Sequence, residues 1–354
     1  MPVVRVDYTH VGRRASGIER VTTEQFSGAA LAPLTICPFR APPRRLGIVA
    51  AQTVLLPMHA VRHPSDVFVF PGFPPSPYFA FVHRRAVLYV HDLFLLTRRA
   101  YLNGAAKYYM APLFSIAVRR LRYFLTNSQE TARQLRGYCS PAATVLPYRP
   151  RIRNVFDLAV GNRAERGPLP ERLRIVSIGT IEPRKNFTGA ADISEALGVR
   201  LRRPVEHHIV GRFGWGEDAK LLQRRPHVVL HGSLSDAAVR PIVEAADILL
   251  CTSHDEGLGL PLLEAQYSGI LVAAPDTAVF REVVDSAGVF IDTGSPLRAA
   301  EQIAAAMADG SWRPKYMAFA VANVARWNAI AENDRAEVIG FLSRLRNVSG
   351  NCHG

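Results

Sequence analysis

The sequence is poor in cysteine and has no long uninterrupted hydrophobic run. Its four cysteines are far apart and form neither a CxxC pair nor a zinc-type cluster with histidine. We therefore expect reduced thiols, as in a cytosolic protein. No stretch of about 18 uncharged apolar residues occurs, and Arg5 and Asp7 interrupt the apolar residues near the N-terminus. These absences predict a chain with neither a signal peptide nor a membrane-spanning helix.

Several common functional motifs are also missing. The sequence contains no GxxxxGK[ST] phosphate loop and no GxGxxG dinucleotide fingerprint, so ATP hydrolysis and nicotinamide redox chemistry are unsupported. It has no DxD motif to hold a divalent metal ion. It also lacks a helix-turn-helix pattern, an RNP motif and a stacking-aromatic motif, although its pI is about 10.0. Nucleic-acid binding is therefore a weakly supported alternative, and we expect no nucleic-acid partner.

Positive charge is abundant and unevenly distributed. The 354-residue chain carries a formal net charge of +13. Residues 1–150 hold 19 Lys and Arg against 6 Asp and Glu, whereas residues 151–354 hold 24 against 24. The whole excess lies in the first half, which indicates an anionic partner such as anionic lipid, nucleic acid or a phosphorylated acceptor. A solvated basic surface is the simpler alternative.

The order of elements predicts an α/β fold with two doubly wound domains. Strand-like runs alternate with helical patterns in both halves, which is typical of βαβ units around a parallel sheet. In the first half, strands are predicted at 3–8, 53–57, 67–72, 86–92 and 124–128, and helices at 17–31 and 115–125. In the second half, strands are predicted at 174–180, 207–211, 228–232, 247–253, 270–275 and 288–292, and helices at 191–197, 236–246, 261–269 and 279–287.

The domain boundary is predicted from a change in composition. A weakly periodic segment rich in Arg, Gly and Pro separates the two halves, and the final part of the chain is helical with no further strand. We predict an N-terminal acceptor-binding domain over 1–150, a linker over 151–170, a C-terminal donor-binding domain over 171–325, and a helix over 326–350 that packs toward the N-terminal domain.

The stretch EGLGLPLLEA places two carboxylates, Glu256 and Glu264, on either side of a glycine loop. The loop follows the strand-like run DILLCTS, and ligands of open α/β sheets bind beyond the carboxyl ends of strands. Pro261 suits the first turn of a helix, so we expect Glu264 within that first turn. Two such acids suit a polyhydroxylated ligand, because carboxylates accept hydrogen bonds from vicinal hydroxyls. Complementation of the helix dipole explains Glu264 equally well.

A second candidate segment, IVSIGTIEPRKN, places Arg184 and Lys185 shortly after a strand that ends at Gly179. Adjacent cations at such a position can bind a diphosphate and stabilise its charge as it leaves. Glycines in both segments allow the backbone to approach a ligand, and free amides there can bind phosphate or a hydroxyl. A basic surface turn is the alternative for this segment.

These segments resemble the C-terminal half of the retaining GT-B glycosyltransferases of family 4, which include bacterial mannosyl- and glucosyltransferases. GTIEPRKN, HGSLSDAAVRPIVEAADILLCTSHDEGLGLPLLEAQYSG and REVVDSAG carry the resemblance, in that order. The N-terminal half resembles the family more loosely, through VDYTHVGRRASGIERV, VLYVHDL and FLTNSQETARQL. The implied fold is GT-B, with two Rossmann-like domains, a cleft between them and a C-terminal helix that crosses back to the first domain.

The resemblance implies roles for the candidate residues of the second half. Glu264 would bind the ribose of a nucleotide sugar, and Glu256 the transferred sugar. Lys185 matches a lysine that contacts the donor diphosphate. Arg184 would supply the second positive charge, because Thr180 stands where the family often has arginine. The other donor-binding candidates in this half are Gly179, Thr180, Gly257, Leu258, Gly259 and Leu260.

Two candidates come from the first half. Gly17 stands where a glycine-rich loop of the family approaches the diphosphate, although the usual double glycine is absent. His91, at the end of the strand-like run AVLYVHD, corresponds to a family histidine close to the reacting sugar. For His91 the alternative is a buried histidine bonded to a backbone carbonyl.

The implied reaction is a retaining hexosyl transfer that needs no metal ion and no cofactor besides the nucleotide-diphosphate sugar. The departing phosphate would help to deprotonate the acceptor on the same face of the sugar. Mannose from GDP-mannose is the first expectation and a UDP-sugar the second. The expected acceptor is a saccharide or a lipid-diphosphate-linked saccharide in polysaccharide or lipopolysaccharide synthesis. A nucleotide-sugar epimerase and a glycogen-type phosphorylase of the same fold are alternatives, but no lysine has a recognisable setting for pyridoxal phosphate.

The predicted helix at 115–125 bears on localisation. Arg119, Arg120 and Arg122 lie close in sequence to Phe114, Ile116 and Phe124. Such a helix can rest on an anionic leaflet, so we predict a cytoplasmic protein with peripheral contact at the inner face of the plasma membrane. Packing in the core, with the arginines in water, is the alternative.

Overall fold

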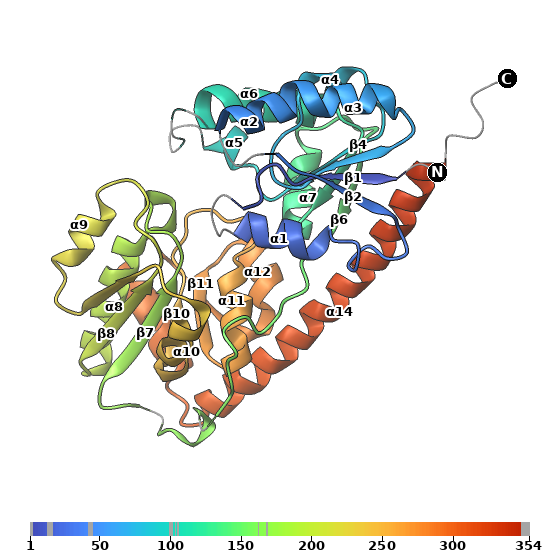
Figure 1. The fold of residues 1–354 in the computed structure, drawn as a ribbon. Helices are drawn as coiled ribbons and strands as arrows, with labels where there is room; N and C mark the ends of the chain where they lie inside the picture. The colour runs from blue at the N-terminus through green and yellow to red at the C-terminus, as the bar shows by residue number, and fades with distance from the viewer. Residues whose placement is uncertain are drawn as a thin grey trace. The chain divides into compact units, whose positions relative to one another are not determined.

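The computed structural model describes residues 3–12, 17–41, 45–98, 102, 104, 106–161, 163–167 and 169–347. The chain divides into two compact units. Unit 1 comprises residues 1–151 and 329–354, and unit 2 comprises residues 152–328. Each unit contains one six-stranded parallel sheet with its helices (Figure 1). The predicted fold class, two Rossmann-like α/β domains, is therefore confirmed.

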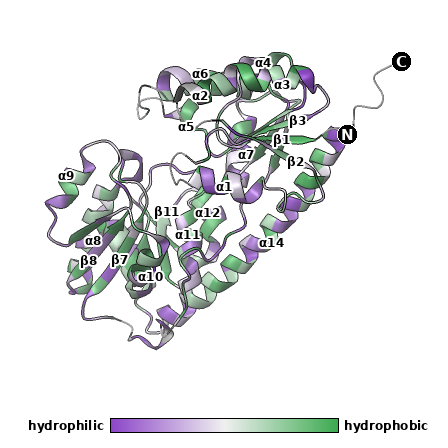
Figure 2. Ribbon diagram, in the orientation of Figure 1, coloured by the Kyte–Doolittle hydropathy of each residue, from purple (hydrophilic) through white to green (hydrophobic). Residues whose placement is uncertain are grey.

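The sheet of unit 1 has the strand order β2-β1-β3-β4-β5-β6. Its strands are β1 (Val4–Asp7), β2 (Ile36–Phe39), β3 (Val67–Phe70), β4 (Ala86–Val90), β5 (Tyr123–Thr126) and β6 (Thr144–Pro147). Its helical segments are α1 (Gly17–Gln25), α2 (Arg45–Ala50), η1 (Ala51–Leu55), α3 (Leu56–Arg62), α4 (Pro77–Phe81), α5 (Phe94–Thr97), η3 (Ala106–Met110), α6 (Ala111–Arg120) and α7 (Gln129–Arg136). β3 and β4 are buried along their whole length, as expected of continuous apolar runs in a parallel sheet covered on both faces (Figure 2).

Residues 53–57 were predicted as a strand, and this prediction is wrong. They span the end of η1 and the start of α3. Gln52, Leu56 and Ala60 are among the buried positions of this region and recur every four residues, as on one face of a helix. The strand β2 was not predicted, because a cysteine and a proline interrupt its apolar pattern.

The helix predicted at 115–125 is also shorter than expected. It corresponds to α6, which ends at Arg120, and the chain then enters β5. Phe114 is 5% exposed and Phe124 is fully buried, and both belong to the core of unit 1. These two rings therefore cannot contact a lipid surface, whereas Ile116 is only partly buried and Arg119 and Arg120 are exposed. Membrane contact through this helix stays a prediction.

The sheet of unit 2 has the strand order β12-β11-β10-β7-β8-β9. Its strands are β7 (Leu173–Ile178), β8 (Val205–Val210), β9 (Val228–Gly232), β10 (Ile248–Leu250), β11 (Leu271–Pro275) and β12 (Gly288–Ile291). Its helical segments are η4 (Arg163–Glu165), η5 (Pro183–Lys185), α8 (Phe187–Leu201), α9 (Asp218–Gln223), α10 (Asp236–Ala245), α11 (Leu260–Ala265), η6 (Gln266–Ser268), α12 (Ala278–Val284), η7 (Asp285–Ala287) and α13 (Pro296–Ala306). All six strands predicted in this half are present.

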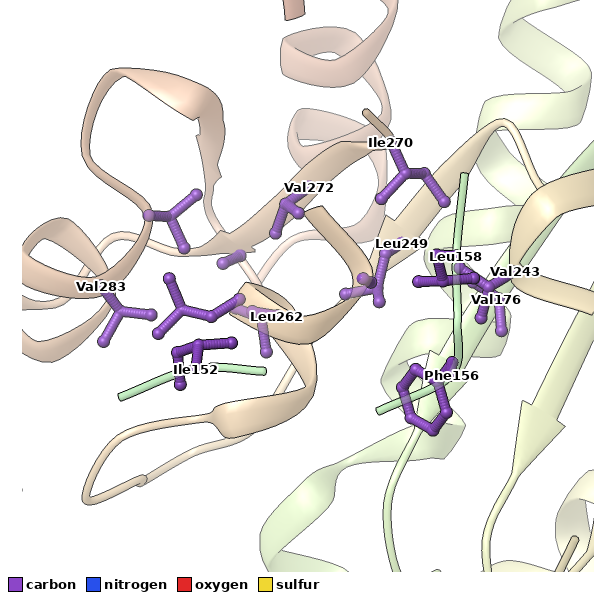
Figure 3. Packing of buried hydrophobic residues seen from close by; sticks show 14 of the residues in the cluster. Ile152, Phe156, Leu158, Val176, Val243, Leu249, Leu262, Ile270, Val272 and Val283 are labelled. Atoms are coloured by element: carbon purple, nitrogen blue, oxygen red, sulfur yellow. The ribbon is translucent and has the colours of Figure 1, made fainter. Parts of the chain in front are cut away.

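The segment that follows unit 1 packs against the core of unit 2. Ile152, Phe156 and Leu158 are buried among side chains of the strands and helices of unit 2 (Figure 3). Asn154 reinforces this packing, because its side chain exchanges two hydrogen bonds of 2.7 Å with the backbone of Leu158. The residues that the composition marked as a linker are thus held in place by apolar contacts.

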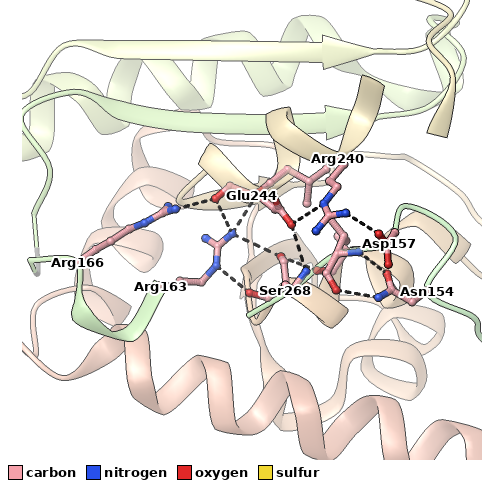
Figure 4. Close-up of polar contacts among 11 residues, drawn as sticks. Asn154, Asp157, Arg163, Arg166, Arg240, Glu244 and Ser268 are labelled. Atoms are coloured by element: carbon pink, nitrogen blue, oxygen red, sulfur yellow. Dashed lines mark hydrogen bonds and ion pairs between the residues drawn. The ribbon is translucent and has the colours of Figure 1, made fainter. Parts of the chain in front are cut away.

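Arg163 holds the same segment through polar contacts. Its side chain is nearly buried and donates hydrogen bonds to three carbonyls at the end of α10 and to the carbonyl of Ser268 (Figure 4). A helix leaves its last carbonyls without partners in the helix, and a guanidinium can satisfy several of them at once. Arg163 therefore caps α10 with a buried positive charge.

The last helix, α14 (Trp312–Asn347), belongs to both units. In unit 2, Trp327 is fully buried and Asn323 donates to the side chain of Gln266 at 2.8 Å. In unit 1, Asp334 forms an ion pair of 2.7 Å with Arg149. The predicted C-terminal helix is therefore present. Within the described part of the chain, no helix is both long enough and apolar enough to span a membrane.

Candidate functional site

The two candidate segments of unit 2 meet at the carboxyl edge of its sheet. One follows β7 and the other follows β10, and these strands are neighbours. The Thr252 hydroxyl lies 3.1 Å from the carbonyl oxygen of Lys185 and 2.8 Å from that of Asn186, and the amide of His254 donates to the Arg184 carbonyl at 2.9 Å. These hydrogen bonds hold the two loops side by side.

Glu256 is paired with both predicted cations. Its Oε2 accepts from Arg184 Nη1 at 3.1 Å, and its Oε1 accepts from the Lys185 ammonium. The Glu256 side chain is only 10% exposed. Burial alone would raise its pKa, but the charges of Lys185 and Arg184, with hydrogen bonds from Lys185 and Ser253, lower the pKa to about 2. Glu256 is therefore anionic at neutral pH and can accept hydrogen bonds but cannot donate a proton.

Arg184 is strongly engaged within the protein. Its Nε and Nη2 donate to Glu182 Oε1 at 3.1 and 2.9 Å, and its Nη1 donates to the Asp255 carbonyl at 2.8 Å as well as to Glu256. A guanidinium has five N–H donors, so these four hydrogen bonds occupy most of them. The arrangement favours Arg184 as the residue that positions Glu256, and Lys185 as the cation that can reach a ligand.

The glycines of this edge allow close backbone packing. Gly211, at the end of β8, has a φ of +155°, and a Cβ at this position would lie 1.7 Å from the carbonyl oxygen of Gly179. Only glycine therefore lets the backbone after β7 and β8 come so close. Gly259 has a φ of +87° directly before α11, a conformation that side-chain-bearing residues rarely adopt. Because residues 257 and 259 are both glycine, the only side chains in the loop after Glu256 are those of Leu258 and Leu260.

Helix α11 positions Glu264 differently from the prediction. The helix begins at Leu260, one residue before Pro261, and has six residues. Glu264 is its fifth residue and so does not lie in the first turn, which makes complementation of the helix dipole a poor explanation for this carboxylate. Glu264 is 4% exposed, and Leu258 is also buried, packed in the core cluster. At Leu258 only the backbone can face a ligand.

Several residues at this edge were not predicted from the sequence. Glu182 fixes Arg184, and Ser253 donates to Glu256. Arg212 follows β8, and its Nε lies 3.2 Å from the hydroxyl oxygen of Thr180. The positively charged side chain of Arg212 therefore lies beside Thr180, although residue 180 is itself uncharged. The available signals were the hydroxyl-bearing residues directly after β10 and the arginine directly after Gly211.

His91 lies in unit 1, directly after β4. Its Nε2 lies 2.6 Å from the Pro71 carbonyl oxygen. Because a carbonyl can only accept, Nε2 carries the proton and Nδ1 is the acceptor of the neutral ring. Burial lowers the pKa of His91 to about 4, against the opposing effect of this hydrogen bond. The ring is therefore neutral at pH 7. The carbonyl bond expected of a structural histidine is present, and the catalytic role stays a prediction.

His10 is a buried histidine of this unit that was not predicted from the sequence. Its Nε2 lies 2.9 Å from the Thr22 hydroxyl oxygen, and a Cβ on Gly72 would lie 2.3 Å from its ring. Burial, and then the charge of His91, lower the pKa of His10 to about 4. Gly17 begins α1 and is exposed, whereas residues 13–16 of the predicted glycine-containing loop lie outside the described residues.

Comparison with known protein families defines the class. Residues 162–322 match the family described as "Glycosyl transferases group 1". This range includes every candidate site residue of unit 2. This matched segment, which is somewhat less than half of the chain, is therefore similar to a group 1 glycosyl transferase domain.

Individual relatives agree with this class. The chain is 25% identical over 293 residues to the O-antigen chain mannosyltransferase B of Escherichia coli, covering 76% of this chain and 75% of the relative. Among solved structures, WaaG, a glycosyltransferase involved in lipopolysaccharide biosynthesis, aligns with a TM-score of 0.67 at 17% identity, covering 96% of this chain and all of WaaG. HepE of Anabaena in complex with UDP-glucose aligns with a TM-score of 0.66 at 17% identity, covering 96% and 99%. The structural matches establish the GT-B fold.

Proposed function

We propose that this protein transfers a hexose from a nucleotide-diphosphate sugar to a saccharide or lipid-linked saccharide in lipopolysaccharide or related polysaccharide synthesis. The observation that carries the proposal is the buried Glu256 carboxylate, held anionic between Lys185 and Arg184 at the carboxyl edge of a Rossmann-like sheet. Mannose from GDP-mannose is the first candidate, because the relative that covers three quarters of the chain is named a mannosyltransferase. A UDP-sugar is the second, in view of the UDP-glucose in HepE.

The donor would bind along the carboxyl edge of the unit 2 sheet. Lys185 has three N–H donors, one of which Glu256 uses, so the ammonium can also donate to a diphosphate. Arg212 can supply the second positive charge beside Thr180, while Arg184 holds Glu256. The amides of residues 257–260 would face the donor, and the Glu264 carboxylate would accept hydrogen bonds from the ribose hydroxyls.

The chemistry proposed for Glu256 is electrostatic. When the anomeric C–O bond breaks, positive charge develops on the sugar and negative charge on the leaving phosphate. A carboxylate with a pKa of about 2 remains ionised throughout and stabilises the sugar, while Lys185 stabilises the phosphate. Because Glu256 is too weak a base to take the acceptor proton, we propose that a phosphate oxygen of the leaving group takes it, with retention at the anomeric carbon.

A thermal-shift screen with GDP, UDP, ADP and dTDP tests this proposal. A ligand present at about 100 times its Kd stabilises a protein by roughly 2.7 kcal/mol, which is a readily measured rise in Tm. We expect GDP to raise the Tm most and UDP next. No rise with any of the four diphosphates at millimolar concentration would contradict a nucleotide-sugar donor.

We also propose that unit 1 contacts an anionic membrane through a surface that combines the end of α4 with Arg119 and Arg120 of the predicted helix. Phe81 and Val82, at the end of α4, are 60% and 62% exposed. The Arg120 guanidinium lies 5.2 Å from the centroid of the Phe81 ring. Arg84 and Arg119 are exposed in the same segments. Apolar side chains surrounded by cations suit the interface of an anionic bilayer.

Flotation with phosphatidylglycerol-containing vesicles tests the membrane proposal. Replacing Phe81 and Val82 together by serine is expected to lower the bound fraction several-fold, because the apolar insertion is lost. Leu297→Ser, at a residue of unit 2 that is 71% exposed, is the matched control and should bind like the wild type. Equal flotation of both variants and the wild type would contradict the proposed surface.

A further inference from the structure

Unit 2 has a pocket with a strongly basic lining at the amino edge of its sheet, where β7 and β10 begin. The pocket has a volume of about 330 Å³, and four arginines line it: Arg166, Arg172, Arg174 and Arg313. Asp247 is its only acidic lining residue among the described ones. Because β7 and β10 run parallel, this pocket and the Glu256 site lie at opposite edges of the same sheet.

Arg313 is the buried centre of this pocket. It is 2% exposed, and its Nη2 forms an ion pair of 2.7 Å with Asp247 while its Nε donates to the Gly167 carbonyl at 3.0 Å. Its Nη1 is buried and has no hydrogen-bond partner among the described residues. A buried guanidinium nitrogen without a partner is costly, so the pocket lacks one acceptor that its lining residues do not supply.

The position of Arg313 in α14 also favours an anion in the pocket. Arg313 is the second residue of a 36-residue helix. The N-terminus of a helix carries partial positive charge and favours anions, so a cation there is unfavourable unless negative charge is close. Arg163, which is also buried and carries no carboxylate partner among its hydrogen bonds, adds a further positive charge nearby. The electrostatic field in the pocket is therefore strongly positive.

The charges of the lining residues indicate how much negative charge the missing anion carries. Asp247 neutralises Arg313, and Glu206 lies 3.6 Å from Arg174. Arg166 donates to the carbonyl of Glu244 at 2.9 Å, which offsets no charge, and Arg172 is exposed with no ion pair to any residue that the structure describes. Two positive charges of the lining thus lack a counter-charge. A phosphate monoester carries about −1.5 to −2 at pH 7, and arginine matches phosphate oxygens in geometry.

We propose that this pocket binds the dianionic phosphoryl group of a small phosphorylated molecule, separately from the nucleotide-sugar site. Arg166, Arg172 and Arg313 donate to the phosphoryl oxygens, and the Nη1 of Arg313 gains the acceptor that it lacks. The volume exceeds that of a phosphate group, so a small organic substituent fits as well. The same phosphoryl chemistry occurs in a soluble phosphate monoester and in a phosphatidic acid headgroup.

Titration of the full chain with glycerol 3-phosphate at low ionic strength, followed by isothermal calorimetry, tests the proposal. The double variant Arg166→Gln/Arg172→Gln keeps the buried Arg313–Asp247 pair and should fold normally. We expect it to bind glycerol 3-phosphate at least about tenfold more weakly than the wild type, because two charge-assisted contacts are lost. Arg298→Gln, at an exposed arginine of α13, is the matched control and should bind like the wild type.

Two further experiments test whether the pocket is distinct from the nucleotide-sugar site, and whether it binds a soluble phosphate monoester or a lipid headgroup. Lys185→Gln alters the nucleotide-sugar site and should leave binding of glycerol 3-phosphate unchanged, whatever its effect on transfer. Vesicles with phosphatidic acid distinguish the source: a loss of flotation in the double variant shows that lipid headgroups also enter the pocket. Binding of glycerol 3-phosphate that is the same in the double variant, in Arg298→Gln and in the wild type would overturn the proposal, as would its loss in Lys185→Gln alone.

Discussion

The variant Glu256→Gln is expected to lower kcat by about 100- to 1000-fold, the effect typical of losing one preorganised electrostatic group. Glutamine keeps the shape of the side chain but removes the negative charge that would stabilise the developing positive charge on the sugar. It also leaves Lys185 and Arg184 without the carboxylate they share. KM for the donor should change much less than kcat, because the charge matters most in the transition state. Steady-state transfer kinetics measure both quantities.

The same variant gives a second, independent reading from stability. The pKa of Glu256 in the folded protein, about 2, lies below the ordinary value of 4.5. Its ion pairs therefore stabilise the fold above about pH 4.5, and this contribution is lost as the pH falls toward 2. The difference in unfolding free energy between wild type and Glu256→Gln should shrink over that interval. Glu217→Gln, which removes an exposed ion pair, is the control variant. If Glu256→Gln transferred sugar as fast as Glu217→Gln, the proposed role of Glu256 would be excluded.

The variant Glu264→Gln is expected to weaken nucleotide binding by roughly 10- to 100-fold, because hydrogen bonds to a charged acceptor contribute about 1.5 to 3 kcal/mol. Glu264 is buried in the short helix directly after the Gly257–Gly259 loop, at the edge of the sheet where the donor is proposed to bind. The loss should be similar for the free nucleotide and for the nucleotide sugar, since both contain the ribose. Calorimetric titration with the preferred diphosphate measures it.

Two comparisons make this second prediction specific. Glu301→Gln, at an exposed glutamate of α13, should bind nucleotide like the wild type. Measurement of Tm in the absence of ligand separates a binding defect from a folding defect in Glu264→Gln. A folded Glu264→Gln protein with wild-type affinity for the nucleotide would remove Glu264 from the donor site.

The sequence predicts the second unit well for a physical reason. Several of its strands are apolar runs bounded by glycine or charged residues, as in RIVSIGT and DILLCTS. Strand ends in a parallel sheet share one edge, so the meeting of the EPRKN and EGLG segments was predictable. The pairing of Glu256 with Lys185 and Arg184 was not, because it depends on Thr252 and on loop conformations that no periodicity encodes.

The first unit shows where sequence patterns fail. The run TVLLP looks like a strand, but its neighbours Gln52 and Ala60 complete a helical face that apolar residues alone do not reveal. The run SIAVRRLRYFL looks like one amphipathic helix, but it contains the end of α6 and the start of β5. The basic pocket around Arg313 was also invisible, because its arginines come from segments that are up to 147 positions apart and meet only in the fold.

The most direct test of the account is a transfer assay with the full chain, radiolabelled GDP-mannose or UDP-glucose, and a lipid-diphosphate-linked saccharide as acceptor. We expect label to move onto the acceptor with release of one nucleoside diphosphate per sugar. We expect no product without acceptor, and Glu256→Gln should lose nearly all of this activity. Conversion of the nucleotide sugar into its epimer without acceptor, or equal transfer by wild type and Glu256→Gln, would contradict it.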